Sequence, residues 1–411
     1  MIMNKVKKDN LRAAIKLAVV FVLILMSNVV SYYVNQEESL PNIVLKLNLL
    51  CVFLLVPYIS IKHGPNGIIN NLTWCFGLML LMSLFHFSSE LSLLTVFVIF
   101  CLMVFGTYSK EWNVEFLNLV YIVIGLFLLP ILAWQLSQSQ IDMGDLLKRR
   151  YTWTEIFAYA TLTKIWVPMI MLSFLTKKGL MFSLLFWVIA VIFNLISLKR
   201  SIIVDSALVF CIILLVSRKI ADKKAKKYLY VGLVFFFAIG VYFIAHSGYL
   251  SEINDISEAM SDRFSDTTED VGEFDRWVES KNYFTKEATI IDDLLGKGWF
   301  SVQHGIVNRV RGHAFLHIGW LNFIFKGGIF FLITILIGYR RVFRVIFHPD
   351  YYSHEKIFEA MFCTFYFFNF FYGHVMSLGI DLFIYFYCLV HVNDRIIYSD
   401  KNLLTNQTIQ G

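Results

Sequence analysis

The sequence predicts an all-α integral membrane protein of about twelve transmembrane helices, and three observations carry that prediction. Apolar residues make up 58% of the chain and charged residues 16%, against roughly 45–50% and 25% in soluble proteins. Apolar runs of about 17–25 residues, long enough to cross a bilayer core roughly 30 Å thick, recur along the chain. One polar, acidic segment, 247–315, interrupts them. Since the bilayer core offers no water to backbone amides, such runs fold as helices.

The apolar runs divide the chain into four parts. We expect helices one to nine in 1–246, a large loop in 247–315, helices ten to twelve in 316–392 and a polar tail in 393–411. The individual spans fall near residues 12–34, 42–61, 68–87, 90–108, 113–134, 155–176, 179–197, 202–217, 229–246, 316–338, 356–374 and 377–392. The first run follows a basic N-terminus and lacks a small-residue cleavage site, so we expect an uncleaved helix and not a removed signal peptide.

Lysine and arginine set the orientation. With a cytoplasmic N-terminus, the inside segments hold most of these residues, including the basic run at 218–227, and the short outside loops hold few. The positive-inside rule therefore predicts that both termini are cytoplasmic and that the 247–315 loop lies outside. All six cysteines fall in apolar runs without a C-x-x-C pair, so neither a disulfide framework nor a zinc site is expected.

The 247–315 loop is longer than a helix connection needs, and such loops are commonly functional. Apolar residues recur at helical spacing in 253–264 and again in 274–291. This pattern predicts two short amphipathic helices lying against the membrane or the mouth of the bundle. Gly296 and Gly298 then break the pattern.

Arginines on the predicted outer face are candidates for binding a lipid phosphate or diphosphate, because a guanidinium binds phosphate oxygens bidentately. Arg200 lies in the short turn between two spans, and Arg263 and Arg276 lie in the loop. Arg276 is in line with Ser280 and Tyr283 on its helix, so we expect this side to face away from the surface beneath and Tyr283 to bind substrate. The alternative is an ordinary interfacial arginine that snorkels or pairs with an aspartate.

A second basic cluster, Arg309, Arg311, His313 and His317, immediately precedes the tenth span. A neutral imidazole accepts a proton near pH 7, and histidines four residues apart share one helix face. The same spacing occurs in metal sites, but no third-ligand motif lies nearby, so we expect no metal. An ordinary interfacial role for each histidine stays open.

Charges within the apolar runs predict a polar cavity, because a charge in the membrane is costly unless it faces a cavity or a partner. They are Lys46, Glu155, Lys164, Asp205 and Lys326. Lys326 follows His317 by about two helical turns, so we expect it to extend the anion site into the bundle. A transporter needs such charges as well.

Several of these elements together resemble the O-antigen polymerase and ligase superfamily. The matching elements are Arg200-Ser201, Arg276-Trp277, Gly296-x-Gly298, and His317 followed by Gly319, Leu321 and Gly327-Gly328-Ile329. They occur in the family's order and spacing over 195–335, and the rest of the chain is similar by helix count alone. Ile318 stands where the family often has asparagine, and His313 offers a competing alignment, so the choice between His317 and His313 stays open.

The resemblance implies a GT-C-like bundle in the bacterial inner membrane that acts as a metal-independent inverting glycosyltransferase without a cofactor. It would polymerise polyprenyl-diphosphate-linked oligosaccharides into O-antigen, capsule or exopolysaccharide. Arg200 and Arg276 would neutralise the departing diphosphate, and His317 would orient or deprotonate the incoming hydroxyl. The substrate-binding residues would be Arg263, Arg309, Arg311, His313, Lys326 and Tyr283. Partners would be the lipid-linked oligosaccharides, membrane lipid, a chain-length regulator and a flippase, with no nucleic acid.

Three rivals remain. An O-antigen ligase shares the same elements but hands the chain to a lipid A core. Metal-dependent GT-C transferases resemble one another in a large first outer loop with paired acids, whereas here that loop spans only about 35–41, with Glu37 and Glu38. A lipid-linked oligosaccharide transporter usually has two related halves, and no such halves are evident.

Overall fold

The computed structural model describes residues 2–34, 41–60, 67–86, 93–138, 157–196, 201–217, 276–299, 301, 316, 318–371 and 380–394. Within these ranges the regular structure is entirely helical, with one isolated bridge between Ile59 and Ser109. The prediction of an all-helical chain is confirmed for this part of the molecule.

The described part of the chain consists of α-helices and short 3-10 or π-helical turns. In chain order they are α1 (Ile2–Val34), α2 (Pro41–Phe53), η1 (Val56–Tyr58), α3 (Gly67–Phe85), α4 (Leu93–Thr107), α5 (Val114–Gln138), α7 (Phe157–Thr176), α8 (Leu180–Ile196), α9 (Ser201–Ser217), α12 (Arg276–Asn282), η2 (Tyr283–Glu287), α13 (Ile290–Leu295), α14 (Gly319–Phe347), η3 (Pro349–Tyr351), α15 (His354–Asn369) and α16 (Ile380–Val392).

Three of the described helices are long and apolar enough to cross a membrane: α3, the Val114–Ile131 part of α5, and α14. Shorter apolar helical stretches occur at Leu49–Tyr58 and within α4, α7, α8, α9 and α16. Large apolar side chains such as Trp74, Leu84 and Phe85 are exposed on α3, as expected of a surface that faces lipid. The predicted span 229–246 and the predicted amphipathic helix at 253–264 lie outside the described residues.

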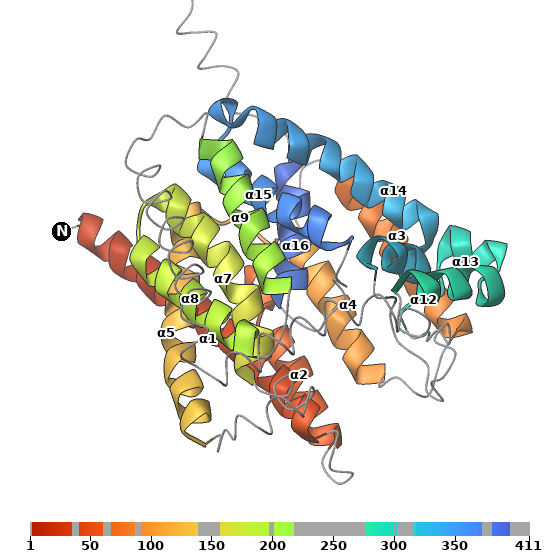
Figure 1. Cartoon of the computed structure of the whole chain (residues 1–411), viewed down its shortest axis with the longest axis horizontal. Coiled ribbons are helices and arrows are strands. Elements are labelled where there is room, and N and C mark those ends of the chain that lie inside the picture. The colour runs from red at the N-terminus through yellow and green to blue at the C-terminus, as the bar shows by residue number, and fades with distance from the viewer. Residues whose placement is uncertain are drawn as a thin grey trace, which may run out of the picture.

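The helices that frame the loop are α3, α14, α15 and α16. Helix α14 packs on α3, α15 and α16, and α4 lies along α16. Helices α4 and α16 approach closely at Gly106, which has no Cβ. A Cβ there would lie 2.3 Å from the carbonyl oxygen of Phe383. Figure 1 shows α12 and α13 gathered beside α3 at one end of α14, away from α1, α5 and α8.

The second predicted amphipathic helix, 274–291, is broken into three pieces in the structure. Helix α12 runs into η2, which is a π-helical turn, and α13 starts after two extended residues. Thr289 and Asp292 form a reciprocal capping box that starts α13. Because the helical phase changes at η2 and at Thr289, residues on the two sides do not share one continuous face.

Candidate functional site

The Gly296–Gly298 element lies against the Lys326–Gly328 element, so two motifs far apart in sequence form one structural unit. The backbone N–H of Lys297 donates to the carbonyl of Phe325 at 2.8 Å, and that of Gly298 donates to the carbonyl of Lys326 at 3.0 Å. Gly328 leaves the helical conformation inside α14, with φ 72° and ψ −179°. The carbonyls before this kink are thereby released from the helical ladder and accept hydrogen bonds from the loop.

Glycine is required on both sides of this contact. At Gly328 a Cβ would lie 2.1 Å from the carbonyl oxygen of Leu294, and at Gly298 it would lie 2.4 Å from Oγ of Ser83. Both glycines also have a positive φ that other residues rarely adopt. Sequence and geometry therefore agree that these positions need glycine for close backbone approach.

Lys326 is buried at the centre of this unit. Its Nζ donates to the carbonyls of Ser301 at 2.9 Å and Trp299 at 3.4 Å, and lies 4.4 Å from the ring centroid of Phe325. From the sequence its charge was expected to belong to an anion site. The described contacts favour a different role, in which the ammonium holds the loop by two of its carbonyls.

The orientation expected for α12 is wrong. Ser280 and Tyr283 were expected to face away from the surface beneath the helix, but both are buried, as is Glu279. Serine and tyrosine were counted as polar, but a small hydroxyl and an aromatic ring are both readily buried. Within α12, the backbone position of Arg276 shares the face of Glu279 and Ser280, at i, i+3 and i+4 spacing.

Tyr283, expected to bind substrate, is fully buried and packs η2 against α14. Its ring packs edge-on against Phe325 at 4.9 Å between centroids, and Nζ of Lys297 lies 5.0 Å from the ring centroid. Burial raises the pKa of Tyr283, with a further contribution from nearby carboxylates, first that of Asp292. The described contacts therefore give Tyr283 a packing role.

The end of α3 holds the other side of the loop, through residues that no sequence motif had singled out. His86 Nε2 lies 3.2 Å from Oδ1 of Asp292, whose other oxygen accepts from the N–H and hydroxyl of Thr289. Ser83 Oγ accepts from the backbone N–H of Trp299 at 2.8 Å. The only sequence signal for this contact was a histidine at the outer end of an apolar run.

The starts of α9 and α14 are linked through the end of α15. Nδ2 of Asn369 donates to Oδ1 of Asp205, in the second turn of α9, at 3.0 Å. The next residue, Phe370, packs against Trp320 at 4.9 Å between ring centroids. Residues that closely follow Arg200 and His317 therefore lie at the same end of the bundle.

Most of the expected site side chains lie outside the part of the chain that the structure describes. They are Arg200, Arg263, Arg309, Arg311, His313 and His317. Arg276 is the first residue of α12, and its side chain is not among those described. The described residues thus define the frame around the expected site.

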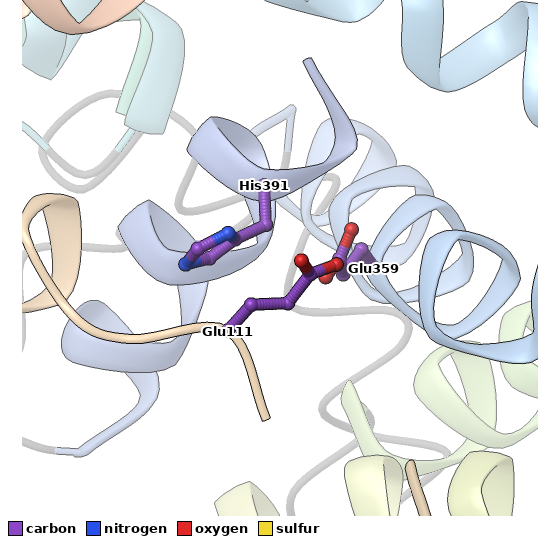
Figure 2. Close-up of side chains that lie close together, drawn as sticks. All are labelled: Glu111, Glu359 and His391. Carbon is purple, nitrogen blue, oxygen red and sulfur yellow. The ribbon is translucent and has the colours of Figure 1, made fainter. Parts of the chain in front are cut away.

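A separate charged cluster joins the α4–α5 connection to the first turns of α15 and the last turn of α16. Glu111, Glu359 and His391 present ligand atoms within 4.8 Å of one another, and Figure 2 shows the three side chains converging. Nζ of Lys356 lies 3.0 Å from Oε1 of Glu111 and 3.3 Å from Oε2 of Glu359, and donates to the carbonyl of His391. Asp394 lies 3.2 Å from Nδ1 of His391.

This donor set suits a divalent cation, but the Lys356 ammonium already lies among the same oxygens. Glu359 and His391 are buried, so the ammonium supplies the positive charge that a buried carboxylate requires. The cluster was not predicted because its members come from segments far apart in the chain.

Searches for similar proteins add no further constraint: no family model matches the chain, and no curated protein or solved structure matches it either.

Proposed function

We propose that this chain is a polysaccharide polymerase of the bacterial inner membrane. It joins polyprenyl-diphosphate-linked oligosaccharide repeat units on the outer face, as a GT-C-like bundle of about twelve spans with both termini in the cytoplasm. The proposal combines the motif resemblance with the arrangement of the described helices.

The observation that supports it most is that the starts of α9 and α14, which carry two parts of the resemblance, meet at the end of α15. Helix α9 begins directly after Arg200, α12 begins at Arg276, and α14 begins two residues after His317. Contacts between Asn369 and Asp205 and between Phe370 and Trp320 link the first to the third. Tyr283, in η2 directly after α12, packs on Phe325 of α14.

In the proposed reaction, a hydroxyl at the non-reducing end of one lipid-linked unit attacks the anomeric carbon of the growing chain. The bond between that carbon and the carrier diphosphate breaks, and the diphosphate leaves. Arg200 and Arg276 neutralise the charge that develops on it, and electrostatic stabilisation of this kind commonly lowers such barriers more than any other effect. His317 orients or deprotonates the incoming hydroxyl, with His313 as the alternative.

A strain that lacks this chain separates the proposal from its rivals. Single repeat units on the surface support a polymerase, and polymer stranded on the carrier lipid supports an O-antigen ligase. Repeat units retained on the inner face of the membrane support a transporter.

Arginine variants test the diphosphate site within the same strain. Arg200→Lys and Arg276→Lys should each abolish most polymer while the protein still accumulates, because lysine lacks the bidentate fork. Arg344→Lys is the matched control, since Arg344 is exposed near the other end of α14. Normal polymer from Arg200→Lys or Arg276→Lys removes that residue from the site.

A further inference from the structure

Asp205 is an ionisable residue within an apolar helix, and the mechanism proposed above does not use it. It lies about 6 Å along α9 from Ser201, where the helix begins. Acidic residues in such helices rarely face lipid and usually line a cavity or a binding site. Asp205 is half-buried, and its carboxylate accepts the hydrogen bond from Asn369.

Further polar groups, on α5, α15 and α16, interact with Asp205 or with one another. The hydroxyl of Tyr366 is hydrogen-bonded to Asp381 in the first turn of α16, and Asp205 and Tyr121 are close enough to act on it electrostatically. Four helices, α5, α9, α15 and α16, thus bring polar groups within electrostatic range of Tyr366.

Trp320 adds an independent sign of a ligand, beside the end of α15 that carries Asn369. Its side chain is 9% exposed, and its indole N–H meets no acceptor among the described residues. A buried donor without an acceptor costs roughly 1–3 kcal/mol, so buried polar groups normally have a partner. Trp320 packs on Phe370, whose neighbour Asn369 bonds to Asp205.

The chemistry of these groups fits a sugar and opposes a phosphate. Carboxylate, amide and indole groups all form hydrogen bonds with hydroxyls, and a sugar presents several of them. Asp205 and Asp381 both carry acidic side chains, which repel a diphosphate. A sugar also lies next to the diphosphate in any lipid-linked repeat unit.

We infer that Asp205, Asn369 and Trp320 form a sugar-binding subsite for the repeat unit, between the starts of α9 and α14 and the end of α15. The inference rests on the proposed function, and it names residues that position the sugar beside the diphosphate site. These residues determine how tightly the repeat unit binds and which sugar is accepted.

The test uses the purified full chain in nanodiscs and lipid-linked repeat units extracted from a strain that lacks the chain. Elongation rates give KM and kcat for these units, and inhibition by inorganic pyrophosphate reports on the diphosphate site separately. Asp205→Asn should raise KM at least about tenfold, and Trp320→Phe about three- to tenfold, as expected for losing a charged and a neutral hydrogen bond. In both variants kcat should stay within about threefold and pyrophosphate inhibition within about twofold.

Asp350→Asn and Trp74→Phe are matched controls, because both residues are exposed and away from this group. An unchanged KM in Asp205→Asn overturns the subsite, and so does a parallel rise in KM and in the pyrophosphate inhibition constant. Should Asp205→Asn fail to accumulate, Asp205→Glu is measured in its place. If neither variant accumulates, the hydrogen bond between Asp205 and Asn369 serves helix packing and the subsite is overturned. Wild-type protein that elongates nothing refutes the proposed function itself.

Discussion

Gly328→Ala should detach the Gly296–Gly298 element from α14. The added Cβ would lie 2.1 Å from the carbonyl oxygen of Leu294, and the residue has φ 72° and ψ −179°. Strain in such a glycine-only conformation costs roughly 1–3 kcal/mol, and overpacking adds roughly 1–3 kcal/mol. The two backbone hydrogen bonds that hold the element contribute about 1–3 kcal/mol together. Because the cost is comparable with the contribution of these two bonds, we expect the contact with α14 to open more often while the bundle stays folded.

Trypsin cleavage after Lys297 measures this detachment, since its backbone N–H is bonded to Phe325 in the docked state. Where opening is fast relative to cleavage, the rate follows the open population, and 2 kcal/mol corresponds to roughly thirtyfold faster cleavage. Gly77→Ala is the control, because no atom lies within 4 Å of its Cβ position and alanine favours the helix. Equal cleavage rates in Gly328→Ala and wild type would refute this account of the contact.

Three further predictions follow from individual side chains. Lys326→Met leaves two buried loop carbonyls without their donor, so the free energy of opening the loop should fall by roughly 1–3 kcal/mol. Trypsin should therefore cleave the loop faster than in wild type. Lys356→Met leaves the buried Glu359 carboxylate without its cation, so unfolding by sodium dodecyl sulfate in mixed micelles should show a loss of about 3–5 kcal/mol that Glu359→Gln largely restores. His317→Ala should lose polymer at every pH tested on polysaccharide gels, whereas His313→Ala should leave shortened chains, because a group four residues away cannot replace one that touches the hydroxyl.

The controls separate these effects from general damage. Lys178→Met breaks an exposed pair with Glu115, at 62% side-chain exposure on both sides, and should change stability by less than about 1 kcal/mol. Slow cleavage in Lys326→Met would mean that its ammonium does not hold the loop. A Glu359→Gln change that fails to rescue Lys356→Met would place the cost elsewhere, and a dead His313→Ala with an active His317→Ala would reverse the histidine assignment.

The helical fold and the loop glycines were predictable, because each depends on local pattern. Apolar runs imply helices in a membrane, and Gly296 and Gly298 break helical periodicity within the polar loop, whereas the kink at Gly328 falls inside a span expected to be continuous. The contact of the loop glycines with α14 was not predictable from one sequence. It depends on which carbonyls the kink at Gly328 releases, and that is a property of tertiary packing.

The contacts found for two predicted binding residues differ from those expected, because each side chain combines a polar group with an apolar part. Tyr283 was taken as a polar substrate-binding residue, but its ring packs against Phe325. Lys326 was taken as part of an anion site, yet its donors are used by loop carbonyls. Lys356 and Glu359 are three residues apart, so their spacing allows an ion pair. The sequence does not show that this pair is buried, and burial is what makes it important for stability.

The most direct test of the central claim is elongation by the purified chain. The protein is reconstituted in nanodiscs with polyprenyl-diphosphate-linked repeat units extracted from a strain that lacks it, and the products are separated by length. We predict a ladder of oligosaccharides growing by whole repeat units, with free carrier diphosphate released once per bond formed, and no ladder from Arg276→Lys. Products that stay one repeat unit long with the wild-type chain would contradict the account.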